Sequence, residues 1–83
     1  MSTKLYELPE DVNNLRSDAN ALIELRDVYV KLPFGFKKAR KCAIDNKRLL
    51  TLFWFRAVEI YPELSGKNLV SDVGGVRIRD DKA

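Results

Sequence analysis

The chain has 83 residues, 46% of them apolar, and its 15 basic and 12 acidic side chains give a net charge of +3. This length fits one domain, 1–83, that buries only about 60–65% of its unfolded surface, so a lone monomer would be marginally stable. With no His and one Cys, the chain has no His/Cys zinc site, no Ser–His or Cys–His catalytic pair and no internal disulfide. We therefore expect a non-catalytic binding protein without metal or cofactor.

No targeting or membrane-spanning segment is predicted. The longest apolar stretch, 49–61, is interrupted by Thr51, Arg56 and Glu59, and it is shorter than the about 20 apolar residues that span a bilayer. The first nine residues contain no apolar run of signal-peptide length. The sequence thus predicts a cytoplasmic protein with no membrane partner.

The first predicted element is a helix over 9–32. Pro9 suits the first helical turn, and the acidic residues Glu10 and Asp11 favour the positive end of the helix dipole. An apolar stripe follows at spacings of three and four residues, comprising Leu8, Val12, Leu15, Ala19, Leu22, Leu25, Tyr29 and Leu32. This period is that of an amphipathic helix. Pro33 and Gly35 then form a short connection, so the next helix should be its antiparallel neighbour.

The second predicted helix spans 36–61, and its apolar positions recur like those of a coiled-coil seam. The seam comprises Phe36, Ala39, Ala43, Asn46, Leu50, Phe53, Ala57 and Ile60. Asn46 is its one polar member. Either Asn46 lies in the seam and fixes the register of packing, or it points sideways to water.

The second half of this helix is apolar on nearly all sides, because Leu52 and Phe55 lie opposite the seam. One partner helix cannot cover both faces. We therefore expect a homo-oligomer whose interface includes Asn46, Leu49, Leu52, Phe53, Trp54 and Phe55. The alternative is that the C-terminal segment folds back over Leu52 and Phe55.

The third predicted element is a β-hairpin over 69–79 with Gly74-Gly75 as its two-residue loop. This loop places Val73 opposite Val76 and Asp72 opposite Arg77. A lone hairpin is marginal in water, so it should dock on its own helices or across a dimer. The expected fold is mainly α: a two-helix antiparallel hairpin with a small C-terminal β-hairpin, assembled into a helical-bundle oligomer.

A basic segment around the start of the second helix is the candidate binding site. Aromatic faces beside cations suit a nucleotide, with stacking for the base and charge for the phosphate, and the same residues are expected to bind either an anionic ligand or a partner protein. The candidate residues are Phe34, Phe36, Lys37, Lys38, Arg40, Lys41 and Arg48. Alternatively, Glu24 and Asp27 near the end of the first helix only pair with the lysines as surface ion pairs.

The layout of a helix, a connection with Pro33 and Gly35, and a second helix with Trp54 in its apolar half resembles small phage-encoded accessory proteins. Among these it is similar to anti-defence proteins that sequester cyclic oligonucleotides and assemble as oligomers. The resemblance covers about 15–57. That family has an Arg-Glu pair after the glycine where this chain has Phe36-Lys37-Lys38, so no binding residue is transferred.

The sequence therefore predicts a binding or inhibitor module that occupies a host protein or sequesters an anionic, nucleotide-like ligand. Two alternatives stay open. One is a small nucleic-acid-binding regulator that places the basic helix on phosphates, and the other is a structural or assembly protein that uses its aromatic stretch as an interface.

Overall fold

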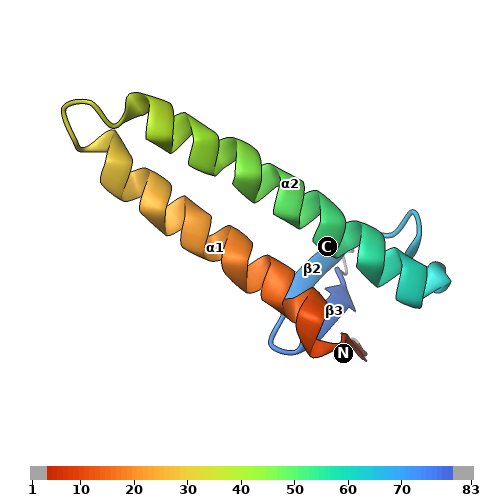
Figure 1. Cartoon of the computed structure of the whole chain (residues 1–83). Helices are drawn as coiled ribbons and strands as arrows, with labels where there is room; N and C mark the ends of the chain where they lie inside the picture. Colours follow the sequence, from red (N-terminus) through yellow and green to blue (C-terminus); the bar gives the residue numbers. More distant parts are fainter. Residues whose placement is uncertain (1–3, 80–83) are drawn as a thin grey trace.

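The computed structural model describes residues 4–79. Two long helices lie side by side and antiparallel, and a small sheet covers one end of the pair (Figure 1). In chain order the elements are β1 (Leu5–Glu7), α1 (Glu10–Val30), α2 (Phe36–Ile60), the short 3-10 helix η1 (Pro62–Leu64), β2 (Leu69–Asp72) and β3 (Gly75–Ile78). The expected fold of a helical hairpin followed by a β-hairpin is confirmed.

The connection between the helices begins slightly earlier than predicted. Helix α1 ends at Val30, and the backbone N–H groups of Lys31 and Leu32 bond to carbonyls three residues back, which tightens the last turn before Pro33. Gly35 is buried where the chain turns into α2. A Cβ there would lie 1.9 Å from the Tyr29 carbonyl oxygen, so the turn requires a glycine.

Small side chains line the contact between the helices away from the sheet. Ala19 of α1 and Ala39 and Cys42 of α2 are buried there, which lets the backbones approach closely. Asn46 is also buried and donates a hydrogen bond from Nδ2 to the Ala19 carbonyl oxygen at 2.6 Å. Of the two predicted placements, Asn46 therefore adopts the one inside the seam.

The sheet has three antiparallel strands in the order β1-β3-β2. Strand β1 was not predicted from the sequence, and it supplies the partner that an isolated hairpin lacks. In the single chain, β3 pairs with β1 of the same chain. Leu8 N–H donates to the Gly74 carbonyl oxygen at 2.9 Å, and Asn13 Nδ2 donates to the same oxygen at 3.1 Å.

The predicted register of the β-hairpin is wrong by two residues. Asp72 pairs with Gly75 and Val70 with Arg77, so the loop is Val73-Gly74. Gly74 takes a φ of +84°, as the third position of a type II turn requires. Gly75 lies inside β3. The position requires a glycine, because a Cβ there would be 2.1 Å from the Tyr6 carbonyl oxygen of β1.

The core lies between the sheet, the start of α1 and the end of α2. It consists of Tyr6, Leu8, Val12, Phe53, Ala57, Leu64 and Val76. The other end of the hairpin projects away from the core (Figure 1), and the radius of gyration is 15.0 Å, against about 12 Å for a compact chain of this length. Within residues 4–79, neither helix has an apolar run long enough to cross a bilayer.

Candidate binding tip of the helical hairpin

The end of the hairpin that lies farthest from the sheet, residues 28–41, is called here the distal tip. Phe34 is 96% exposed and Phe36 is 76% exposed. Three further exposed apolar side chains surround the connection, namely Val28, Val30 and Leu32. Isolated exposed apolar residues are ordinary, but a group of this size is typical of an interaction surface.

The distal tip is also strongly basic. Between residues 24 and 41 there are six basic and two acidic side chains, for a net charge of +4. Lys37, Lys38, Arg40 and Lys41 are all exposed. The predicted binding residues 34–41 are therefore brought together at one end of the molecule.

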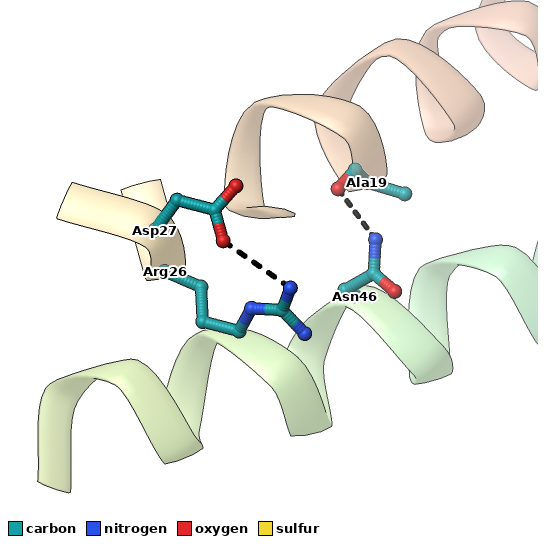
Figure 2. A network of polar contacts seen from close by, with 4 residues as sticks. All are labelled: Ala19, Arg26, Asp27 and Asn46. Carbon is teal, nitrogen blue, oxygen red and sulfur yellow. Dashed lines mark hydrogen bonds and ion pairs between the residues drawn. The ribbon is translucent and has the colours of Figure 1, made fainter. Parts of the chain in front are cut away.

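The acidic side chains of α1 do not neutralise these cations. Asp27 pairs with Arg26 of its own helix at 3.2 Å (Figure 2), and Lys41 pairs with Asp45 of its own helix at 3.0 Å. Within residues 4–79, no ion pair joins α1 to α2. Pairing between the helices, which was the alternative explanation of the basic segment, does not form.

The position of the cations opposes helix stability. The first turn of α2 contains no acidic residue and has no side-chain cap, while Lys37 and Lys38 lie in it. A cation at the positive end of a helix dipole costs about 0.3–1 kcal/mol. Part of this is offset at Lys38, whose Nζ lies 5.6 Å from the centre of the Tyr29 ring. Stability of the fold does not explain these lysines.

Two shallow hollows flank the distal tip. One, of about 180 Å³, is lined by Tyr29, Leu32, Phe34, Gly35 and Lys38. The other, of about 360 Å³, lies between the helices and is lined by Arg26, Val30, Phe36, Ala39, Arg40 and Ala43. Its lining is almost wholly apolar. Of its two arginines, Arg26 is already paired with Asp27, so the hollow suits an apolar side chain with Arg40 beside it for a carboxylate.

Arg48 does not belong to the distal tip. It lies further along α2, where it lines a separate groove of about 380 Å³ with Ile44, Lys47, Thr51 and Leu52. Its side chain is exposed. The sequence placed it with the tip because both carry the same charge, whereas the structure separates them along the helix.

The residues predicted to form an oligomer interface fall into two groups. Asn46 and Phe53 are buried inside the chain itself, at 8% and 0% exposure, and are unavailable to another molecule. Leu52 and Phe55 are 44% and 62% exposed. The remaining two, Leu49 and Trp54, are half-buried.

The described part of the C-terminal segment, up to residue 79, does not cover Leu52 and Phe55 as the alternative interpretation suggested. It packs instead on the neighbouring side of α2, where Trp54 and Val58 line a hollow with Leu64 and Leu69. Within the described part of the chain, the outer face of α2 is therefore left without a partner.

Sequence reasoning missed part of the tip. Val28 and Val30 carried a usable signal, since both lie outside the main apolar stripe of α1 and neither is covered in the structure. The sequence gives no such signal for Arg26, because Arg26 lines a hollow only when α1 packs against α2.

The sheet end has a different polar chemistry. Burial and a hydrogen bond to Glu63 raise the pKa of the Tyr6 hydroxyl. The guanidinium of Arg77 and the backbone N–H of Val73 bond to Asp72 and lower the pKa of its carboxyl group. Residues 4–79 contain no group of three or more acidic or Cys side chains placed to hold a metal ion.

No protein-family model matches the chain, and no curated protein or solved structure is significantly similar to it.

Proposed function

We propose that the chain is a non-catalytic binding module whose distal tip engages an acidic, partly apolar surface of a partner protein. Binding there would inhibit the partner by occupying that surface. The observation that carries this proposal is the placement of Phe34 and Phe36, 96% and 76% exposed, among cations that no residue of α1 neutralises.

A protein partner fits the tip better than a nucleotide does. Small-molecule sites are concave, typically about 300–1,000 Å³, and enclose most of the ligand. The hollow beside Phe34 is only about 180 Å³, and the hollow of about 360 Å³ between the helices is shallow and open to solvent, so neither encloses a ligand. Phe34 itself projects into solvent. A projecting aromatic side chain with a polar rim is the usual form of a protein–protein anchor.

Electrostatic attraction would guide the encounter. The net charge of +4 over residues 24–41 attracts an acidic surface and raises the association rate at low ionic strength. The hollow between the helices then suits a segment that presents an apolar side chain, with a neighbouring Asp or Glu that pairs with Arg40.

The biological setting is proposed from the resemblance to phage accessory proteins. In that setting the partner is a host protein, the module acts as an inhibitor of host defence in the host cytoplasm, and it works as a homo-oligomer. The surface that would join two copies is argued below from separate residues.

Photo-crosslinking tests the proposal. A benzophenone amino acid at position 34 should crosslink one acidic partner in host lysate treated with nuclease. The same group at position 73, which is 83% exposed at the opposite end, should not. Lys37→Glu in the first variant should reduce the crosslink about tenfold. Equal labelling from both positions would show that the tip has no binding role.

Nucleic-acid binding is separated by a second measurement. We expect no change in the fluorescence anisotropy of labelled DNA or RNA oligonucleotides at micromolar protein. Binding that weakens steeply with salt would instead favour the nucleic-acid-binding regulator, because phosphate contacts release counterions.

A further inference from the structure

The outer face of α2 carries an apolar stripe that nothing else in residues 4–79 covers. Ile44, Leu52 and Phe55 are 52%, 44% and 62% exposed. At 100° per residue these three positions lie on one side of the helix, together with Lys41 and Arg48. This stripe is separate from the distal tip and from the core under the sheet.

The groove on this face has the shape of a receptor for one large side chain. Its lining includes Ile44, Lys47, Arg48 and Thr51, which are positions i, i+3, i+4 and i+7 of one helix. Four residues at this spacing form the hole that receives a knob from a facing helix in knobs-into-holes packing. The groove measures about 380 Å³, enough for an aromatic ring.

The same face also supplies a knob. Phe55 lies one turn beyond the groove and projects into solvent. A hole and a knob on one helix face are self-complementary when a second copy packs antiparallel about a two-fold axis, as in an isologous dimer. Phe55 of each copy then enters the groove of the other.

Charge along the face favours this direction of packing. Seating Phe55 over the middle of 44–51 places Thr51 near the two-fold axis. Antiparallel symmetry then sets Lys41 of one copy within about one turn of Glu59 of the second. Each of these residues also has an ion-pair partner on its own helix, Asp45 for Lys41 and Arg56 for Glu59, so the contact between copies would extend these pairs. Parallel packing would instead bring the two basic tips together, each with a net charge of +4 over residues 24–41, and like charges repel.

We propose that the outer face of α2 is a homodimer surface, in which two copies pack antiparallel with Phe55 of each in the Ile44–Thr51 groove of the other. Because the surface lies along one helix, we expect it to bury less than the about 800 Å² per partner of a standard interface. The expected dissociation constant is therefore micromolar. The distal tips point in opposite directions in this dimer, so both stay free for partners.

Sedimentation equilibrium between 1 and 200 μM tests self-association. The wild-type chain should pass from monomer to dimer over this range. Phe55→Asp should weaken the dimer at least tenfold, while Val73→Asp, which alters an exposed residue of the β-loop, should leave it unchanged. Circular dichroism checks that both variants stay folded. A wild-type monomer at 200 μM would overturn the proposal.

Cysteine crosslinking tests the packing direction. In a Cys42→Ala background, Thr51→Cys should form a disulfide-linked dimer on mild oxidation because position 51 lies near the two-fold axis. Val70→Cys, exposed on the sheet, should not. Lys41→Glu and Glu59→Lys should each weaken the dimer, and the double variant should recover it. A dimer that crosslinks through position 70, or one that charge reversal leaves unchanged, contradicts the antiparallel arrangement.

The two proposals fail separately. Phe34→Ser should remove partner binding and leave dimerisation unchanged. Phe55→Asp should weaken dimerisation and leave partner binding unchanged. If Phe34→Ser also prevents dimerisation, the dimer surface has been assigned to the wrong face.

Discussion

Asn46 of α2 donates a hydrogen bond of 2.6 Å from its side-chain amide to the backbone carbonyl oxygen of Ala19 on α1 (Figure 2). The Asn46 side chain is buried among small residues of the helix contact, at 8% exposure. If either helix slid by one turn, the amide would lose its acceptor while still buried, which is costly. This bond therefore fixes the register of the two helices.

Replacement of Asn46 by Ala should lower the free energy of unfolding by about 1–2 kcal/mol, since a buried hydrogen bond and its packing are lost. Urea denaturation followed by circular dichroism measures this. Asn14→Ala is the matched control, because Asn14 is exposed on α1 and its replacement should not destabilise the chain. Equal losses from both would mean that the bond to Ala19 does not hold the hairpin.

Gly35→Ala should destabilise the chain by about 2–3 kcal/mol, because forcing a methyl group into a packed site displaces its neighbours. The neighbour here is the Tyr29 carbonyl oxygen, 1.9 Å from the added Cβ. At Gly74 an added Cβ would lie in open space, and only the positive φ is unfavourable for alanine. Gly74→Ala should therefore lower the free energy of unfolding by about 1–2 kcal/mol. Thermal or urea unfolding would rank the two, and the reverse order would contradict the close approach at Gly35.

Lys37→Glu should raise the free energy of unfolding by about 0.3–1 kcal/mol at low salt, since an acidic side chain at the start of α2 suits the helix dipole. The gain should fade in 1 M NaCl as the charge is screened. Lys67→Glu, which lies outside the helices and is exposed, controls for the change in net charge. A stability gain with lost partner binding would separate the role of Lys37 in binding from its effect on folding.

Asp72→Asn should destabilise the chain at pH 7 and lose this effect in acid. The bonds from Arg77 and Val73 lower the pKa of the Asp72 carboxyl from its ordinary 3.8. The stabilisation that the ionised Asp72 carboxylate gives to the folded chain is therefore complete above pH 3.8. It disappears as the pH falls through the lowered pKa. Urea midpoints of the wild type and of Asp72→Asn, measured at pH 7, 4 and 2.5, should therefore approach each other as the pH falls.

The exposed carboxylate of Asp18 on α1 serves as the control for that series, since it makes no ion pair within residues 4–79. Asp18→Asn should shift the urea midpoint little at any of the three pH values. A gap between wild type and Asp72→Asn that stays constant down to pH 2.5 would contradict the role given to the carboxylate.

The helices were predictable because their apolar spacing is regular over many turns and because Pro33 and Gly35 mark the connection. Strand β1 was not, since three residues are too few to show an alternating pattern. The position of Gly75 was misread for a related reason. Its lack of a side chain serves the close approach of β1, a demand that comes from a segment almost seventy residues away.

The candidate tip was only partly readable from sequence. Its cations and phenylalanines are adjacent in the chain, so their grouping followed from local order alone. Whether Asp27 would neutralise them depended on the rotation of α1 about its axis. The groove on the outer face of α2 was likewise invisible until the side that the sheet covers was known.

The central position of β3 in the sheet has a consequence for the order of folding. Its neighbours are β1, near the start of the chain, and β2, directly before it. The helical hairpin relies on contacts that are local in sequence and can form early, whereas closing β1 onto β3 joins distant segments and is slower. During synthesis the core around Phe53 thus stays incomplete until Val76 of β3 has emerged, and β3 is expected to dock last.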